Sequence, residues 1–158
     1  MLARRRIESV ECATGATSEG LLGRTLRRGT VGRSHTGWLT ARYDCTRPAV
    51  LLQVSDSFGE VLPLVISRVR AWLDLDADPA VIQACLSPET RNAAGAPGGD
   101  LAGLRVPGCL DGFELGVRAI LGQQVTVAAA RTLCQRLVER FGEPLPTPWP
   151  APVSYTHL

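Results

Sequence analysis

Residues 104–141 decide the fold of this chain, and they read LRVPGCLDGFELGVRAILGQQVTVAAARTLCQRLVERF. The stretch predicts two amphipathic helices joined by a short polar turn. Pro107 and Gly108 interrupt the preceding segment, and Asp111 is a natural N-cap for the first helix. Apolar side chains then recur at helical spacing and form one stripe: Phe113, Val117, Ile120 and Leu121.

The second helix is expected to begin at the N-cap Thr126 and to end at Gly142. It has an apolar face and a largely polar opposite face. We expect the two helices to expose apolar faces suited to neighbours that this chain lacks, which predicts marginal stability. The apolar face consists of Val127, Ala130, Leu133, Cys134, Leu137, Val138 and Phe141, and the polar one of Arg131, Gln135, Glu139 and Arg140.

Gly122, Gln123 and Gln124 form the turn between these helices. Glycine allows a sharp turn of the backbone, and two adjacent amides offer hydrogen-bond donors and acceptors where a simple connector often has Asp, Asn, Ser or Gly. By spacing alone, a solvated connector is the more common explanation, because most short helix connections have no further role.

The segment PGCLDGFELGVRAILGQQVTVAAARTL, residues 107–133, resembles the start of the central helical domain in the bacterial 3-methyladenine DNA glycosylase II family. This family belongs to the helix-hairpin-helix glycosylase superfamily. A weaker similarity extends back through residues 6–11, residues 23–26 and the strand after His35, which resemble the small α+β domain of the family.

The resemblance implies base excision repair of alkylated DNA, in which the N-glycosidic bond of 3-methyladenine and related bases is hydrolysed. The implied partner is double-stranded DNA with alkylated bases, and no cofactor or metal is implied. The family's catalytic aspartate and helix-hairpin-helix motif lie downstream of the matched region. We therefore assign no catalytic residue here and expect the 158-residue polypeptide to lack glycosylase activity.

By the same resemblance, Gly122, Gln123 and Gln124 would bind DNA at the gap left by the flipped base. The two amides would fill that gap and hydrogen-bond the orphaned partner base. Some members of the family have an apolar side chain at the position of Gln124, which acts as a wedge between bases. Glutamine at this position is less suited to unstacking bases. Arg118 is a phosphate contact in this interpretation, but its spacing is equally consistent with an ion pair to Glu114.

Two further functions fit the same residues. The chain could be a noncatalytic DNA-binding part of an alkylation-response regulator, or a protein-interaction module built on an amphipathic hairpin. A downstream helix-hairpin-helix followed by aspartate would select the enzyme. Salt-dependent binding to duplex DNA would separate the regulator from the interaction module.

Strand-like segments occupy residues 6–13, 21–26, 37–43 and 49–54, with glycines such as Gly29, Gly32 and Gly37 between them. They predict an antiparallel sheet of about three or four strands. A helix over residues 58–74 is expected to cover this sheet.

That covering helix carries a broad apolar face, with Ser57 as its cap and Pro63 in its first turns. Asp78 and Pro79 then start a short helix that runs through residue 86.

The expected fold class is α+β, with a small antiparallel sheet and covering helix followed by the first helices of an all-α glycosylase domain. The predicted parts are an N-terminal domain at 1–86, a linker at 87–103, the truncated helical domain at 104–142 and a proline-rich tail at 143–158. We expect a fragment at both ends, with a tail that is a stiff extended connector and final residues that are non-native and unpacked.

Composition adds few constraints. The net charge of +2 is too small to identify a nucleic-acid-binding protein by itself. The five cysteines include no C-x-x-C pair, which argues against a disulfide framework or a cysteine-rich zinc site, and Cys85 and Cys134 are expected to be buried. Without a signal peptide or a membrane-length apolar run, the sequence predicts a cytoplasmic protein, which we expect to be a monomer with no membrane partner.

Overall fold

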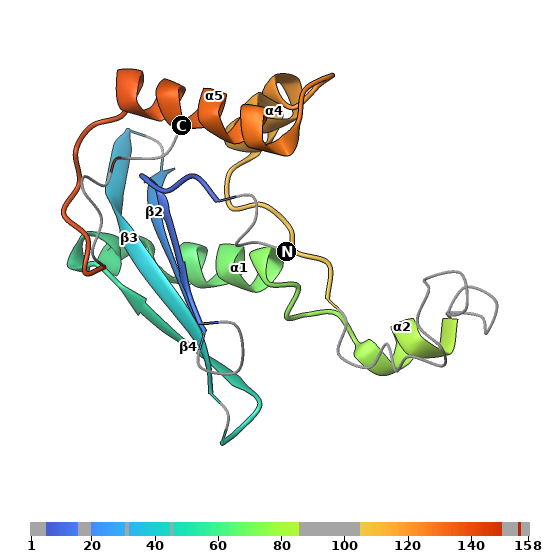
Figure 1. Ribbon diagram of the computed structural model, residues 1–158. Helices are drawn as coiled ribbons and strands as arrows, with labels where there is room; N and C mark the ends of the chain where they lie inside the picture. Colours follow the sequence, from blue (N-terminus) through green and yellow to red (C-terminus); the bar gives the residue numbers. More distant parts are fainter. Residues whose placement is uncertain are drawn as a thin grey trace. The chain divides into compact units, whose positions relative to one another are not determined.

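A computed structural model of the chain describes residues 6–15, 20–30, 32–44, 46–85, 105–149 and 155. A four-stranded antiparallel sheet with helices after it makes the fold α+β, as predicted (Figure 1). The strands lie in sequence order, β1-β2-β3-β4, so each pairs with its neighbour along the chain. They are β1 (Glu11–Thr14), β2 (Leu21–Thr30), β3 (Arg33–Asp44) and β4 (Ala49–Val54).

Two of the glycines expected to separate strands lie inside them instead. Gly29 is in β2 and Gly37 is in β3, opposite Leu26. Gly37 is required by close packing, because a Cβ there would overlap the Oγ atoms of the two serines at 55 and 57. Gly32 does form the turn between β2 and β3, with a φ of +84° that favours glycine.

The helix expected over residues 58–74 is a 3-10 helix, η2 (Asp56–Val61), followed by the α-helix α1 (Leu62–Trp72). Pro63 is the second residue of α1, as predicted, where its missing N–H removes no helical hydrogen bond.

Ser57 is not the cap of this segment, and the predicted apolar face is narrower than expected. Ser55 precedes η2, and its Oγ accepts a hydrogen bond from the backbone N–H of Trp38 at 3.2 Å. The fully buried Phe58 lies beside Gly37, which places η2 against β3. Leu62 and Ile66 are exposed.

The chain forms two compact units, one of Met1–Val65 with Asp111–Leu158 and one of Ile66–Leu110. The second unit holds most of α1 and the helix α2 (Pro79–Cys85), which Asp78 caps through a 2.9 Å bond from the backbone N–H of Ala80, as predicted. Cys85 is exposed, so its predicted burial is wrong. The predicted linker at 87–103 lies outside the described residues.

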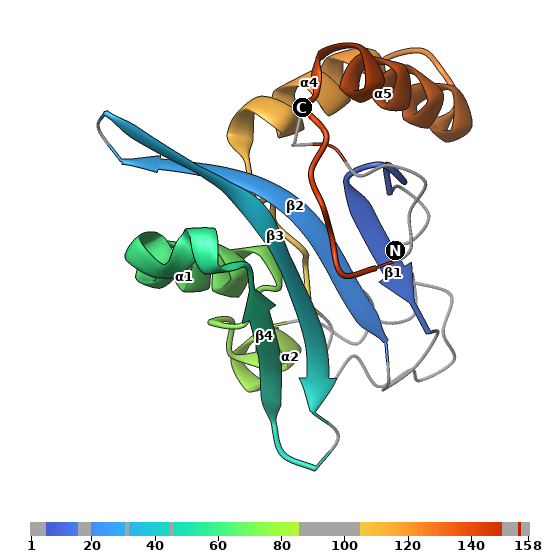
Figure 2. The same cartoon turned by 90° about the vertical axis from the view of Figure 1, so that its left-hand side faces the viewer.

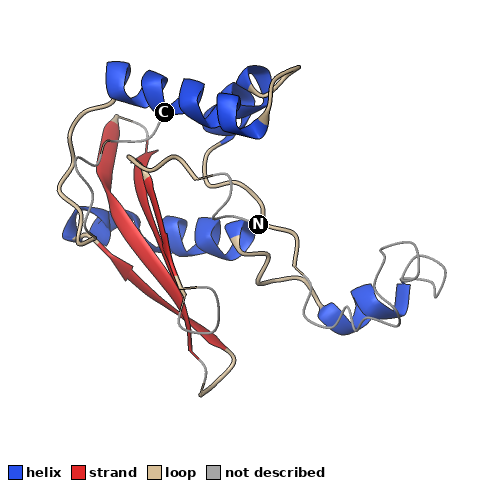
Figure 3. Ribbon diagram, viewed as in Figure 1, coloured by secondary structure: helices blue, strands red, loops and turns tan. Residues whose placement is uncertain are grey.

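Two helices of the first unit form the hairpin predicted from the sequence (Figure 3). They are α4 (Gly112–Leu121) and α5 (Val127–Phe141). Both predicted caps are confirmed: the Oδ1 of Asp111 accepts from the backbone N–H of Glu114 at 2.9 Å, and the Oγ1 of Thr126 accepts from that of Ala129 at 3.2 Å. Gly142 follows α5 in an extended conformation, with φ −76° and ψ 156°.

The segment after α5 returns alongside the sheet (Figure 2). Trp149 is buried, and its ring stands edge-on to that of Trp38 in β3, with centroids 6.4 Å apart. Tyr155 donates its backbone N–H to the carbonyl oxygen of Ser9 at 2.8 Å. The expectation of an unpacked tail is therefore wrong at these two described positions, because Trp149 packs against Trp38 and Tyr155 bonds to Ser9.

Candidate nucleic-acid interface

Residues 122–125 connect α4 to α5, and we call them the elbow. Gly122 continues the helix with φ −86° and ψ −3°, so the sharp turn expected at this glycine lies elsewhere. It lies at Gln124, whose φ is +57°. Gly122 is required for a different reason, since a Cβ there would lie 2.9 Å from the carbonyl oxygen of Arg118.

The elbow presents Gln123 and Gln124 to solvent. No hydrogen bond joins either side-chain amide to another described residue, so their donors and acceptors are available to a ligand. The left-handed backbone of Gln124 costs about 1 kcal/mol, because a Cβ crowds the neighbouring carbonyl in that conformation. Such strained residues cluster at binding sites, where the surrounding structure holds them in place.

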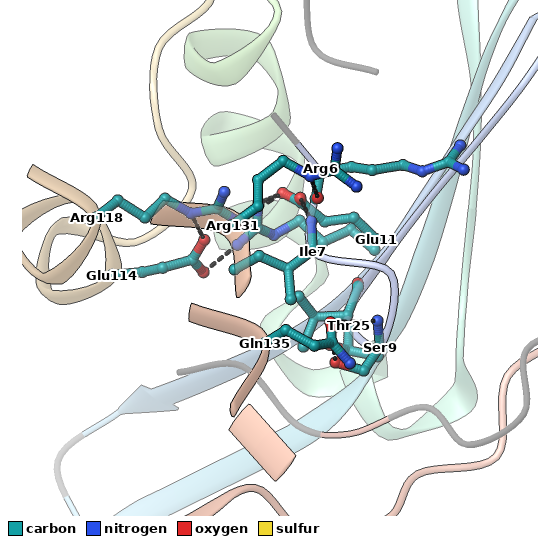
Figure 4. A network of polar contacts seen from close by, with 11 residues as sticks. Arg6, Ile7, Ser9, Glu11, Thr25, Glu114, Arg118, Arg131 and Gln135 are labelled. Atoms are coloured by element: carbon teal, nitrogen blue, oxygen red, sulfur yellow. Dashed lines mark hydrogen bonds and ion pairs between the residues drawn. The ribbon is translucent and has the colours of Figure 1, made fainter. Parts of the chain in front are cut away.

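Four charged residues connect α4 to the sheet, and together we call them the charge ring: Glu11 of β1, Arg24 of β2, and Glu114 and Arg118 of α4. Glu11 and Arg24 face each other across the β1–β2 pair. Figure 4 shows Glu11, Glu114 and Arg118 converging from the sheet and the helix.

Each residue of the charge ring pairs with two others. Arg24 donates to the Oε1 of Glu11 at 2.5 Å and, through its other terminal nitrogen, to Glu114. Arg118 donates from Nε to Glu114 at 2.6 Å, and its Nη2 lies 3.0 Å from the Oε1 of Glu11. The remaining oxygen of Glu11 accepts the backbone N–H of Ile7 at 2.7 Å. Every carboxylate oxygen in the ring thus has a partner.

The charge ring is largely shielded from water. Its side chains are 4% exposed for Glu114, 7% for Arg24, 17% for Glu11 and 24% for Arg118. Burial disfavours the ionised form of Glu114, but the guanidinium groups of Arg24 and Arg118 outweigh burial and hold the pKa of this carboxyl below its usual value. Two positive and two negative charges therefore coexist in a nearly closed site.

Of the two roles considered for Arg118, the structure confirms the ion pair with Glu114. Two carboxylates of the chain, those of Glu11 and Glu114, pair with it. The phosphate contact stays a prediction. The sequence also missed Glu11 and Arg24, although both lie in the segments that carry the weaker family resemblance.

α5 contacts the N-terminal segment through residues of its predicted polar face. Gln135 accepts from the backbone N–H and the hydroxyl of Ser9, at 3.4 and 3.2 Å, and Arg131 donates to the carbonyl oxygen of Arg6 at 3.1 Å. These contacts place residues 6–9 against part of the predicted polar face of the helix. The apolar part of the contact is a cluster of Ile7, Val10, Cys134 and Val138, and burial raises the pKa of the Cys134 thiol.

The hairpin leaves most of its apolar side chains exposed, as predicted. Glu114 is the buried residue of α4, while Phe113 and Ile120 of the same helix are each 70% exposed. On α5, Val127, Leu133 and Phe141 are exposed as well. α4 therefore turns its charged residues toward the sheet, while Phe113, Ile120 and Phe141 of the hairpin stay exposed.

No other chemistry stands out in the described part of the chain. No group of three or more His, Cys, Asp or Glu side chains there is placed to hold a metal ion. The helices within the described ranges all fall short of the length and apolar character needed to cross a membrane. Cys12, Cys85, Cys109 and Cys134 are free thiols.

Comparison with known proteins shows which family the chain is similar to. Residues 1–111 match the family described as the AlkA N-terminal domain. The chain is 34% identical over 144 residues to DNA-3-methyladenine glycosylase 2 of Escherichia coli K12, an alignment that covers 91% of this chain and 45% of that protein. It is 41% identical over 97 residues to the "Probable bifunctional transcriptional activator/DNA repair enzyme AlkA" of Mycobacterium tuberculosis, covering 60% of this chain and 18% of that protein. The chain thus spans less than half the length of these curated relatives.

Proposed function

Because the chain belongs to the AlkA N-terminal domain family, we propose that it is the front part of a glycosylase that removes 3-methyladenine and related alkylated bases from duplex DNA. The observation that carries the proposal is the elbow, which displays two solvent-exposed amides, one of them on a strained backbone. We place this activity in the cytoplasm, in a monomeric protein that needs no metal or cofactor.

The elbow would act on DNA by occupying the gap that a flipped base leaves. Gln123 and Gln124 both carry amide donors and acceptors, so they can hydrogen-bond the edge of an unpaired base as well as fill space. Gly122 would let the DNA backbone approach closely at the end of α4. Arg118 would add positive charge one turn before the elbow, while it stays paired within the charge ring.

We also propose that α4 and α5 are the first helices of the helical glycosylase domain in the parent protein. The exposed apolar face of the hairpin supports this, because further helices of such a domain would bury Phe113, Ile120 and Phe141. Residues 104–142 would then belong to the glycosylase domain and residues 1–86 to the N-terminal domain. The catalytic carboxylate would come from chain beyond this region.

Binding to damaged DNA tests the role of the elbow. Fluorescence anisotropy would compare the 158-residue chain on a labelled duplex with a tetrahydrofuran abasic analogue and on the undamaged duplex, over a series of salt concentrations. We expect tighter binding to the abasic duplex and weaker binding at higher salt. Gln123→Ala and Gln124→Ala should lose the preference, whereas Gln53→Ala, which removes an exposed amide from β4, should retain it.

Two results would overturn this part of the proposal. Equal affinity for the abasic and the undamaged duplex would show that the elbow does not recognise the lesion. Absence of salt-dependent binding would favour the protein-interaction module instead.

The regulator remains a second candidate, favoured by one specific observation. The Mycobacterium tuberculosis relative carries a name that joins a transcriptional activator to a DNA repair enzyme. An assay of the full-length parent protein for release of 3-methyladenine from methylated DNA separates the two, since only the enzyme releases the base. For the 158-residue chain alone we expect no release.

A further inference from the structure

We propose that the charge ring positions the elbow for DNA, so that Glu11 and Arg24 of the sheet act as positioning residues for Gln123 and Gln124. This inference rests on the proposed function. It adds that the small α+β unit takes part in lesion binding through buried ion pairs, without touching the DNA itself.

The path from the ring to the elbow is short and passes through one residue. The side chain of Arg118 is held by Glu11 and Glu114, at 3.0 and 2.6 Å. The backbone carbonyl of Arg118 accepts the N–H of Gly122, the first residue of the elbow, at 3.0 Å. The missing Cβ of Gly122 lets that carbonyl approach, so a movement of Arg118 is transmitted directly to the elbow.

The ring also fixes α4 in rotation and along its axis. Arg24 reaches from β2 to Glu114 near the start of the helix, and Glu11 reaches from β1 to Arg118 one turn later. Two separate attachments from two adjacent strands prevent the helix from turning about its own axis. Ion pairs with fixed geometry are suited to this task, because apolar contacts tolerate sliding whereas a guanidinium shared by two carboxylates does not.

The charge arrangement is poorly explained by stability alone. Removing charged groups from water is costly, and well-packed apolar residues of similar size often stabilise such a site equally well. Phe113, Leu115 and Ile120 of α4 are exposed, whereas Leu121 at its end packs against the apolar cluster, so ion pairs attach the first part of the helix to the sheet. Buried polar contacts of this kind select one arrangement among several, which is what a DNA-reading turn requires.

The test uses Arg24→Met in the 158-residue chain and measures the ratio of affinities for the abasic and undamaged duplexes. Both affinities scale with the folded fraction, so the ratio reports the arrangement of the elbow and not the loss of folded protein. We expect the ratio to fall about tenfold. Arg42→Met, which removes an exposed arginine from β3 of the same sheet, is the matched control and should leave the ratio unchanged.

Glu114→Gln is a milder second variant, because it keeps the shape of the side chain while it removes the charge and replaces one acceptor oxygen with an amide donor. It should lower the ratio in the same direction, and it carries the test where Arg24→Met folds poorly. A wild-type ratio in both variants, or an equal loss in Arg42→Met, would overturn the positioning role.

Hydrogen exchange of the backbone amides separates failure of this inference from failure of the proposed function. If the wild-type chain shows no preference for abasic DNA, the proposed function fails, and the ring is judged by exchange alone. Faster exchange in α4 and the elbow of Arg24→Met, with no change in Arg42→Met, supports positioning. Equal exchange in the two variants overturns it.

Discussion

Replacing Arg24 with methionine perturbs the charge balance of the ring, and the structure gives the size of the effect. The wild-type ring holds two guanidinium groups and two carboxylates, and the variant leaves both carboxylates with Arg118 alone. Glu114 is only 4% exposed, so water cannot compensate for the lost partner. Removing one member of such a buried pair costs about 3–5 kcal/mol. That is a large part of the roughly 5–15 kcal/mol that stabilises a typical domain.

Urea unfolding followed by circular dichroism measures this loss. We expect Arg24→Met to lower the free energy of unfolding by about 3–5 kcal/mol, and the exposed Arg42→Met to change it by less than about 0.5 kcal/mol. In the double variant Arg24→Met with Glu114→Gln, the two remaining charged residues, Glu11 and Arg118, have a net charge of zero, as the wild-type ring has. The double variant should therefore lose about 1–3 kcal/mol less than the sum of the two single losses.

Additive losses in the double variant would refute the reasoning, because they would mean that Arg24 and Glu114 do not interact. A loss of less than about 1 kcal/mol in Arg24→Met would refute it as well, since that is the range of an exposed ion pair.

Three further predictions follow from individual contacts. The pKa of the Glu114 carboxyl is lowered in the folded chain, so its ionised form stabilises the fold above the ordinary value of 4.5, and this stabilisation is lost as the pH falls below that value. In urea titrations, the difference in unfolding free energy between wild type and Glu114→Gln should therefore shrink at acidic pH. A difference that stays constant with pH would contradict this. Gln124→Gly relieves the left-handed backbone strain and should raise the free energy of unfolding by about 1 kcal/mol. In fluorescence anisotropy, the same variant should bind abasic DNA more weakly, because it lacks the amide. Unchanged binding would mean that the Gln124 amide has no role. Gly23→Ala places a Cβ 3.0 Å from the ring of Trp149 and should lower the free energy of unfolding in urea by about 1–3 kcal/mol. Wild-type stability together with an unchanged tryptophan spectrum would show that the Trp149 ring does not pack against Gly23.

The hairpin shows which structural features can be predicted from residues that are close together in the sequence. Asp111 and Thr126 cap the two helices as the sequence predicted, because a cap is decided by residues within one turn of each other. The apolar stripe of α4 could also be anticipated, since its apolar residues recur at helical spacing. The position of the sharp turn could not, because both Gly122 and Gln124 can adopt it and only the packing against Arg118 selects between them.

The contacts of the polar faces were beyond local reasoning. Periodicity identifies a polar face, but it does not distinguish a face that meets water from one that meets other charges. Gln135 and Arg131 were predicted only to share a polar face, and the structure shows that they contact residues 6–9. Cys85 was placed in a core by the same reasoning and is exposed.

The sequence by itself determined the presence of four strands, though not all of their bounds, the two capped helices, the amide turn and the family, because each is encoded by neighbouring residues or by a contiguous motif. Only the tertiary structure decided that Glu114 is buried and that Arg118 is held by carboxylates from two elements. The ring joins residues 13 and 90 positions apart, and nothing local specifies which distant charge neutralises which. A charged side chain is stable in such a buried site only when folding brings its counter-charges to it, so its burial is a property of the folded chain.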